Sequence, residues 1–494
     1  MVIEEEYIRL IFGLKLKQIR TEKKLSLFGL AKLSGLSKSY LNEIEKGKKY
    51  PKTDKISILA EKLEVPYDHF VSLKLDKNLA PIGEILQSKI LKEIPLNLFG
   101  IQENNLIDII ANAPAKVNAF ISTIIKISQN YNLTRESFFL ASLRSYQEAH
   151  NNYFEDTEDA VEKFAKLYQI DLSKKIKSKD LEEILIEEYN YVIDLKELKK
   201  HQKLKTLRSV FIPKKTTLLI HPDISEAQKT FIYAKELAYN FLEIEDRLYT
   251  FPWVKFDRFD QVLNNFIASY FAGALIIPQK EIVNDIKDVF EQKTWKKTDF
   301  TNIIKKYNCS DETFYQRLTN ILPKKFNIKN LFFLRFTHQK NTNTFRLSKE
   351  LHITQQQAPH ANRNNEHYCR RWVALETLYD LEKPDPKKRV IKLQKSSYED
   401  SKNEYLVLSS ASPDPFRENQ NRSISIGLLI SPHLKKRIQF LDDPRITKKT
   451  VGVTCETCAV QDCKERKAKP WRLEQQQQYK DIATSIDHII ENYN

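Results

Sequence analysis

The chain has 494 residues, of which 41% are hydrophobic and 29% charged, a balance that is typical of soluble globular proteins and excludes wholesale disorder. This length predicts two to four domains, at about 100 to 200 residues per domain. Lys and Arg outnumber Asp and Glu by 15. Such a surplus favours a polyanionic partner, with nucleic acid ahead of anionic lipid or a phosphorylated ligand.

The first ten residues, MVIEEEYIRL, are acidic and lack the basic and then apolar pattern of a secretory signal. The longest nearly apolar run, residues 266–277, is shorter than the roughly 20 residues that span a bilayer. We therefore expect a cytoplasmic protein with no membrane partner. Thiols are reduced in that compartment, so clustered cysteines indicate metal binding or redox chemistry before disulfides.

Residues 1–75 predict a bundle of five helices. Apolar side chains recur at helical spacing over residues 7–23. Ser26 and Ser37 are placed to cap the second and third helices, and SGLS at 34–37 provides a tight turn between them. Two helices joined by such a turn form a helix-turn-helix, whose second helix lies in the major groove of DNA.

The stretch AKLSGLSKSYLNEIEKGKKYP, residues 31–51, resembles the Xre/Cro-type helix-turn-helix family. Many members have Gln at the start of the second helix, where this chain has Leu27. In this register polar side chains of the third helix meet base edges and the following cations lie beside phosphates; a solvated basic face is the alternative. The candidate DNA-binding residues are Ser37, Lys38, Ser39, Tyr40, Asn42, Lys46, Lys48 and Lys49.

Two short strand patterns precede a helical pattern that carries KELAY at 235–239. A zinc protease would have HExxH there, with two His as ligands and the Glu as base. Lys235 and Tyr239 are poor substitutes, and residues 261–278, which resemble the third-ligand helix, contain no carboxylate. The region resembles the IrrE/ImmA-like peptidase fold without its ligands, so we expect no catalytic residues and no enzyme.

After Leu331, strand patterns alternate with HYCRRWVALETLYDL at 367–381, a predicted helix opened by Cys369. Three further cysteines follow in a C-x2-C-x4-C motif. Three thiolates leave a tetrahedral zinc or a four-iron cluster one ligand short, and Cys369 is the natural fourth, ahead of several histidines. The candidate metal ligands are Cys369, Cys455, Cys458 and Cys463, with iron–sulfur favoured over zinc and the absence of metal as the other alternative.

The whole sequence predicts a multidomain, mostly α-helical protein with an α+β C-terminal part. The predicted domains are a helix-turn-helix domain (1–75), a helical connector (76–165), a degenerate zincin-like, IrrE-type domain (166–331), an α+β sensor domain with the cysteines (332–475) and a C-terminal helix (476–494).

This order of parts, with NNYF at 151–154, CRRW at 369–372 and CETCAVQDCKER at 455–466, resembles the short-chain fatty acyl regulator (ScfR) family. Its members include the propionate and glyoxylate-pathway regulators. The resemblance spans essentially the whole chain and implies a transcriptional regulator of acyl-CoA metabolism with a short-chain acyl-CoA as effector and, as in some members, a [4Fe–4S] cluster.

Helix-turn-helix readers bind paired half-sites, so we expect a homodimer on an operator in double-stranded DNA. Candidate contacts to the acyl-CoA are Arg370, Arg371 and Trp372. The alternative function is an IrrE/ImmA-like peptidase, or a partner-binding pseudopeptidase, that acts on a repressor and holds a structural zinc on four cysteines.

Overall fold

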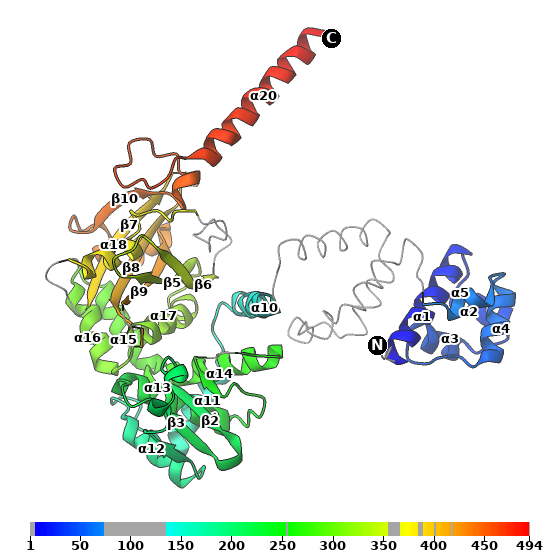
Figure 1. Ribbon diagram of the computed structural model, residues 1–494, viewed down its shortest axis with the longest axis horizontal. Helices are drawn as coiled ribbons and strands as arrows, with labels where there is room; N and C mark the ends of the chain where they lie inside the picture. Colours follow the sequence, from blue (N-terminus) through cyan, green and yellow to red (C-terminus); the bar gives the residue numbers. More distant parts are fainter. Residues whose placement is uncertain are drawn as a thin grey trace. The chain divides into compact units, whose positions relative to one another are not determined.

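A computed structural model describes two compact units, which divide between Ser142 and Leu143 (Figure 1). Most of the predicted connector lies outside the described residues. These are residues 5–73, 135–252, 255–353, 366–383, 389–399, 402–414, 416–417 and 419–493.

The first unit contains the five predicted helices. Apolar side chains from all five form one core, in which Leu41 and Ile44 are fully buried. The helix expected over 7–23 and the caps expected at Ser26 and Ser37 are confirmed. The bounds are α1 Glu5–Glu22, α2 Leu27–Ser34, α3 Lys38–Glu45, α4 Thr53–Lys62 and α5 Tyr67–Val71.

Two features hold α3 against α1. Arg20 Nε and Nη2 lie 2.6 and 2.9 Å from the two carboxylate oxygens of Glu45, which makes a bidentate pair. Gly47, just after α3, has a φ of +67°, and a Cβ there would lie 2.5 Å from Leu10 Cδ2. Only glycine suits that backbone conformation and space, so the end of α3 is fixed closely beside α1.

The chain enters the second unit through α10 (Arg135–Ala149), the NNYF segment and α11 (Glu155–Leu167). Asn152 in NNYF donates from Nδ2 to Thr319 Oγ1 at 2.8 Å, and its carbonyl accepts from Asn320 Nδ2 at 2.8 Å. Both partners belong to a buried helix of the second unit. The NNYF segment therefore anchors the end of the predicted connector.

A buried ion pair fixes α11 in the same unit. Arg317 is 1% exposed, and its Nη1 and Nη2 lie 2.5 and 2.8 Å from the two carboxylate oxygens of Glu158. Tyr270 donates to the same carboxylate at 2.6 Å. Val161 and Phe164 join the main hydrophobic core. The last part of the predicted connector is thus integral to the second unit.

The first half of the second unit is built around a four-stranded sheet of order β1-β3-β2-β4, in which only the β1–β3 pair is parallel. The two predicted strands and the KELAY helix correspond to β2, β3 and α13. The bounds are α12 Ser178–Glu187, β1 Val192–Asp194, η2 Leu198–Lys200, η3 Gln202–Leu204, β2 Ser209–Ile212, η4 Pro213–Lys215, β3 Thr217–Ile220, α13 Glu226–Phe241, β4 Thr250–Phe251 and α14 Phe259–Ile276.

Three helices lead to the second sheet: α15 (Gln279–Phe290), α16 (Lys297–Tyr307) and α17 (Asp311–Lys325). The side chain of Ser310 caps α17 by accepting the Thr313 N–H at 3.1 Å. Most of the apolar side chains of α17 are buried, so this helix packs in the core.

The second sheet has six strands in the order β10-β7-β8-β9-β5-β6, antiparallel except for the β10–β7 pair. The five strands predicted after Leu331 are β5 to β9; β10 was not predicted. The bounds are β5 Leu331–Gln339, β6 Phe345–Ile353, α18 Val373–Leu381, β7 Val390–Tyr398, β8 Glu404–Pro413, β9 Gln420–Leu429, α19 Pro432–Arg437, η5 Gln439–Asp442, β10 Thr447–Val451, η6 Cys455–Thr457 and α20 Trp471–Tyr493.

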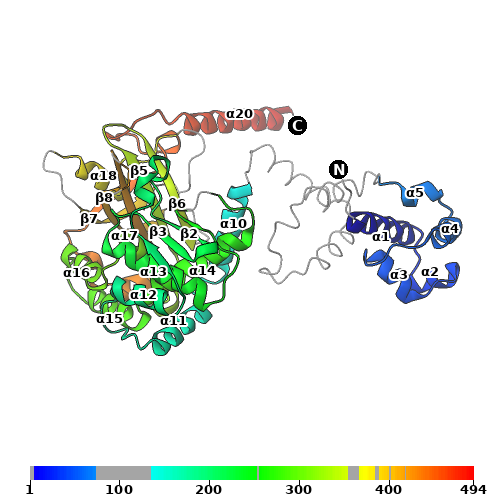
Figure 2. The same cartoon turned by 60° about the horizontal axis from the view of Figure 1, so that its bottom comes forward.

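Helices cover both faces of this sheet (Figure 2). Alternate side chains along β5 point to opposite faces. Phe332 and Leu334 pack with α18, whereas Leu331 and Phe333 join the core formed with α15, α16 and α17. That core continues into the four-stranded sheet, so the domain boundary predicted after residue 331 lies inside one packed unit.

The chain ends in the long helix α20, which begins at Trp471, five residues before the predicted start at 476. Among the described residues, no single helix is long and apolar enough to cross a membrane. The pair α14 and α15 meets that criterion only when the two helices are taken together, and they are bent by 65°.

Candidate functional site

The turn between α2 and α3 joins two capped helix ends. Ser26 Oγ accepts the Gly29 N–H at 2.9 Å, and Ser37 Oγ accepts the Tyr40 N–H at 3.1 Å. Gly35 ends α2 with a φ of +70°, in the left-handed region that glycine adopts freely. These contacts set the direction of α3 relative to α2.

The outward face of α3 is polar. Lys49 Nζ lies 5.3 Å from the centroid of the Tyr40 ring and 3.7 Å from Glu43 Oε2, which holds one cation beside the helix. Of the predicted DNA-binding residues, Tyr40 is half-buried. Those that are exposed are Ser37, Lys38, Ser39, Asn42, Lys46, Lys48 and Lys49.

A hydrogen-bonded trio joins α13 to α14 in the second unit, at the positions compared above with zinc-protease ligands. Lys235 Nζ donates to Asn265 Oδ1 at 2.5 Å, and the Tyr239 hydroxyl lies 3.5 Å from the same oxygen. Asn265 belongs to α14, the helix that resembles a third-ligand helix. Burial lowers the pKa of Lys235 to about 7. An amine, a phenol and an amide do not match the donor set of zinc, so these residues do not fit the metal.

Glu236, compared above with a protease base, contacts two buried side chains. It forms a buried ion pair with Arg247 and accepts from the Tyr191 hydroxyl at 3.1 Å. The Arg247 guanidinium also lies 4.0 Å from the centroid of the Tyr239 ring. Glu236 therefore stabilises the interior of the fold instead of facing a substrate.

Several cationic side chains surround Glu312 beside this trio. Arg335 Nη1 lies 3.0 and 3.1 Å from the two Glu312 oxygens, and Lys349 Nζ lies 3.5 Å from Oε1. Burial alone would raise the pKa of Glu312, but Arg335, Lys349, Arg422 and Arg208 hold that pKa well below its usual range. The Glu312 carboxylate is therefore ionised, and more than one cationic side chain surrounds it.

Two cations of this group form no direct ion pair among the described residues. The Arg208 guanidinium lies 5.1 and 5.5 Å from the ring centroids of Phe251 and Phe416, with no ion pair among the described residues, and burial lowers the Arg208 pKa. Arg422 Nε is buried without a hydrogen-bond partner in the described part of the chain. Lys235 Nζ lies 4.9 Å from the centroid of the same Phe251 ring, so the trio adjoins this group.

We call these side chains the cation cluster. Its positive groups outnumber its carboxylates. Arg208 and Arg422 are half-buried and form no ion pair among the described residues, so an anion would be favoured beside them. The cations are Arg208, Lys235, Arg335, Lys349 and Arg422, and the carboxylates are Glu312 and Asp414.

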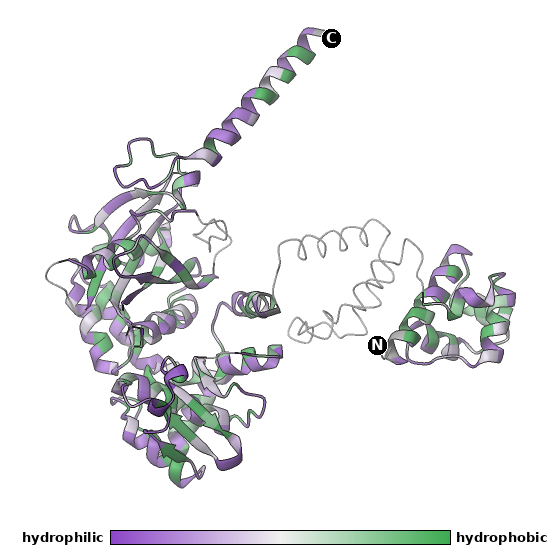
Figure 3. Ribbon diagram, viewed as in Figure 1, coloured by the Kyte–Doolittle hydropathy of each residue, from purple (hydrophilic) through white to green (hydrophobic). Residues whose placement is uncertain are grey.

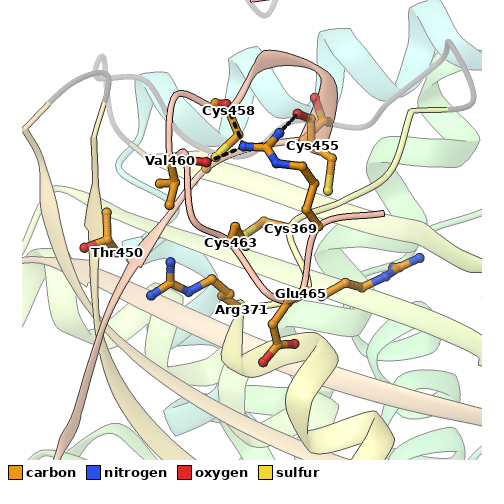
Figure 4. A pocket seen from close by; sticks show the side chains of 12 residues that line it. Cys369, Arg371, Thr450, Cys455, Cys458, Val460, Cys463 and Glu465 are labelled. Atoms are coloured by element: carbon orange, nitrogen blue, oxygen red, sulfur yellow. Dashed lines mark hydrogen bonds between the residues drawn. The ribbon is translucent and has the colours of Figure 1, made fainter. Parts of the chain in front are cut away.

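The four predicted cysteines line one cavity of about 10 Å³ (Figure 4). Cys369, Cys455 and Cys458 are buried and Cys463 is half-buried; Arg371 lies at the same cavity. Within the described residues, no group of three or more His, Cys, Asp or Glu side chains is arranged to hold a metal ion. The fold brings the four thiols to one cavity, but they are not in a coordination geometry.

Arg466 organises the cysteine loop. Its Nη1 donates to the Cys455 carbonyl at 2.9 Å, and its Nη2 donates to the carbonyls of Cys458, at 3.2 Å, and Val460. The Lys467 N–H points at Cys455 Sγ, 3.4 Å away.

The sequence predicted that Cys369 opens a helix, but in the structure it does not. Helix α18 begins only at Val373, because the preceding chain pairs with the cysteine loop: Tyr368 and Thr454 form an antiparallel bridge, and the Cys369 N–H donates to the Val453 carbonyl at 3.1 Å. The helix dipole therefore does not act on this thiol. The bridge itself brings Cys369 to the other three cysteines.

Burial raises the pKa of the Cys369 thiol to about 11, against the opposing effect of N–H groups of Gly452 and Arg371. The neighbouring thiols of Cys455 and Cys458 raise this pKa further. Four thiols with backbone N–H donors match the chemistry of a zinc or iron–sulfur centre. The cavity volume is that of about one water molecule, so it suits a single ion and must widen around a cluster.

Arg370 and Trp372, which the sequence predicted as ligand contacts, both make contacts within the protein, and Arg370 lies at the cysteine cavity. Trp372 is buried, and its indole N–H donates to the Gly452 carbonyl at 2.8 Å. Arg370 is also buried, stacks 4.3 Å from the Phe345 ring centroid and donates to the Asn343 carbonyl at 3.0 Å. Trp372 thus joins the segment of Cys369 to the cysteine loop, whereas Arg370 joins it to the turn before β6.

Residues 16–70 match the family described as helix-turn-helix. These residues of the first unit form a helix-turn-helix domain. Over 480 residues the chain is 22% identical to HTH-type transcriptional regulator RamB of Mycobacterium tuberculosis (strain CDC 1551 / Oshkosh), covering 92% of this chain and 93% of that protein. HTH-type transcriptional repressor RghR of Bacillus subtilis (strain 168) is 43% identical over 58 residues, 12% of this chain and 43% of the repressor.

A solved structure of a Mycobacterium tuberculosis transcriptional regulator is 16% identical, covers 66% of this chain and 92% of its own, and superposes with a TM-score of 0.46. The relatives of the helix-turn-helix domain and of the longer chain are thus named as regulators and not as enzymes, in agreement with the expected absence of catalysis.

Sequence reasoning missed Asn265 and most of the cation cluster. Asn265 could have been found from the sequence, because it lies in residues 261–278, the stretch compared with a third-ligand helix. Arg208, Glu312 and Arg422 had none, since they come from segments far apart in the chain and only the folded unit brings them together.

Proposed function

We propose that the protein is a DNA-binding transcriptional regulator that uses α3 of its helix-turn-helix domain as recognition helix. The observation that carries this proposal is the exposed polar face of α3, with Asn42 at its centre and Lys46, Lys48 and Lys49 beside it, on a domain that matches the helix-turn-helix family. Such domains read operators as dimers, and we propose a homodimer.

We further propose that a short-chain acyl-CoA is the effector and that the cation cluster holds its phosphates. The resemblance to the ScfR family supports the choice of ligand. The cluster supports the place, because Arg208 lacks an ion-pair partner and Arg422 has a buried N–H without an acceptor among the described residues. The ligand regulates only by binding one conformation better than another.

The four cysteines are proposed to hold a metal centre. A [4Fe–4S] cluster is supported by the resemblance, while the small cavity favours a single zinc ion as the alternative. In either case Cys369, Cys455, Cys458 and Cys463 are the ligands, and the centre ties the chain's end to the segment that precedes α18.

The experiment that tests this function maps the genomic binding sites of the protein with and without acetyl-CoA and propionyl-CoA. A shared operator sequence whose occupancy changes with one of these thioesters supports the proposal. Cleavage of a partner repressor by the purified protein, sensitive to chelators, would instead support the peptidase alternative.

A substitution in the cation cluster tests where the effector binds. Arg208→Gln should weaken binding of the active acyl-CoA at least tenfold in a calorimetric titration, since it removes a half-buried cation that has no ion-pair partner among the described residues. Arg437→Gln on α19, an exposed arginine, is the matched control and should bind normally. Unchanged affinity in Arg208→Gln, or loss only in Arg371→Gln, rules out the cation cluster.

A further inference from the structure

Helix α20 has an apolar stripe with nothing packed on it in the described part of the chain. Figure 3 shows hydrophobic and hydrophilic residues alternating along a helix that extends away from the sheets. Apart from Arg472, every α20 side chain that the structure describes is exposed. Tyr479, Ile482, Ile486 and Ile489 are 64%, 49%, 50% and 56% exposed.

The stripe has the spacing of a coiled coil. Tyr479, Ile482, Ile486 and Ile489 are separated by three, four and three residues, which places them at successive a and d positions of a heptad. A 23-residue helix is about 34 Å long, or about three heptads. Helices in proteins owe most of their stability to packing of such a face, so this one requires a partner.

The residues that flank the stripe favour a second copy of the same helix. Positions e and g of the heptads are Gln478, Ala483, Ser485 and Ile490, none of which is charged. Two identical helices can therefore align without like-charge repulsion along the seam. The charged side chains Lys480, Asp481 and Asp487 lie at b and c positions, away from it.

The start of α20 is fixed to the cysteine loop. Arg472 Nε lies 2.5 Å from Glu366 Oε1, and Glu366 Oε2 accepts from the Thr454 hydroxyl at 2.9 Å. The helix is thus held at its base and presents the stripe beyond the body of the unit. The stripe is fixed at one end, is exposed and can pair with an identical helix. These three properties are those of a helix that joins two copies of a protein.

We propose that α20 pairs with α20 of a second copy of this chain and forms the principal self-association contact. This proposal does not rest on DNA binding, because the contact forms in the free protein.

The test is the molar mass of the full chain, measured by light scattering after size exclusion and by sedimentation, without DNA. We expect a mass of at least two chains at micromolar concentration. Ile486→Lys should lower it to that of one chain, or raise the dissociation constant at least 100-fold, whereas Thr484→Lys, the same charge on the opposite face of α20, should leave it unchanged.

A wild-type protein that is monomeric at tens of micromolar overturns the proposal, since the stripe then has another occupant, such as residues 74–134. Retention of the oligomer in Ile486→Lys overturns it equally, because the copies then meet elsewhere. Circular dichroism at 208 and 222 nm checks the fold of Ile486→Lys. Any loss of helical signal should be no larger than the contribution of α20.

Discussion

Lys235 Nζ lies 2.5 Å from Asn265 Oδ1, so a hydrogen bond joins α13 to α14. Lys235 and Arg208 both lie beside the Phe251 ring, at 4.9 and 5.1 Å from its centroid. Two cationic side chains so close together favour binding of an anion.

Lys235 gives a pH-dependent stability with a definite sign. Its pKa is about 7 in the folded protein and 10.5 ordinarily, so between these values the unfolded chain binds more protons. The free energy of unfolding of the second unit should therefore rise from pH 7 to 9, by at most about 1.4 kcal/mol per pH unit.

Urea unfolding at both pH values measures this rise. The rise in unfolding free energy between pH 7 and 9 should be smaller in Lys235→Met, because the titrating amine is gone. It should be unaltered in Lys214→Met, because Lys214 is exposed. Equal rises in Lys235→Met and the wild type would falsify the assignment to Lys235.

Asn42 should read bases. Asn42→Ala is expected to cost about 1–3 kcal/mol at the operator and to relax the preference at one base position, because an amide side chain recognises a base edge through paired hydrogen bonds. Binding to a panel of singly mutated operators measures this. A uniform loss across the panel would show that Asn42 contacts only the backbone.

Lys48 should behave differently, since it lies beyond α3 and is exposed for contact with phosphate. Lys48→Ala is expected to weaken all DNA sequences alike and to reduce the slope of log affinity against log salt by about 1. Fluorescence anisotropy at several salt concentrations measures the slope. Lys62→Ala on α4 is the control and should not alter it.

Cys369 should matter to the metal as much as the clustered cysteines do. After anaerobic purification, Cys369→Ser and Cys458→Ser should both lose most of the bound iron or zinc, because either change leaves three thiolates. Cys309→Ser, a change at the buried fifth cysteine, should retain it. Metal content and visible absorbance decide between the two metals, and full loading of Cys369→Ser would move the fourth ligand elsewhere.

The buried pair of Glu158 and Arg317 should dominate the attachment of α11. Glu158→Gln leaves a buried guanidinium without its counter-charge and is expected to cost about 3–5 kcal/mol of unfolding free energy. Glu155→Gln, one turn earlier, removes an exposed pair with Lys324 and should cost less than about 1 kcal/mol. Chemical denaturation of the two variants compares them directly.

The elements that the sequence predicted well are those with strong local signals. The caps at Ser26 and Ser37 and the period-two pattern of β5 are properties of a few adjacent residues. Helix α18 shows the limit of such signals: its predicted first turn is extended because Tyr368 pairs with Thr454, a partner distant in the chain. Tertiary pairing overrode local helical preference.

The candidate sites divide in the same way. The cysteine motif carries its own spacing, so all four thiols could be named from the sequence and the structure brings them to one cavity. The cation cluster carries no motif. Arg208, Glu312 and Arg422 come from a loop, a helix and a strand, and only the shared core that joins the two sheets makes them neighbours.

The bridge between Tyr368 and Thr454 also sets an order of events during synthesis. Cys369 leaves the ribosome before Cys455, Cys458 and Cys463, which follow it by 86 to 94 residues. The proposed centre can be complete only once Cys463 has emerged and the segment after β10 has paired with Tyr368. Metal insertion at the proposed centre would therefore follow the pairing of these two segments, and chains truncated before Cys463 would lack the finished site.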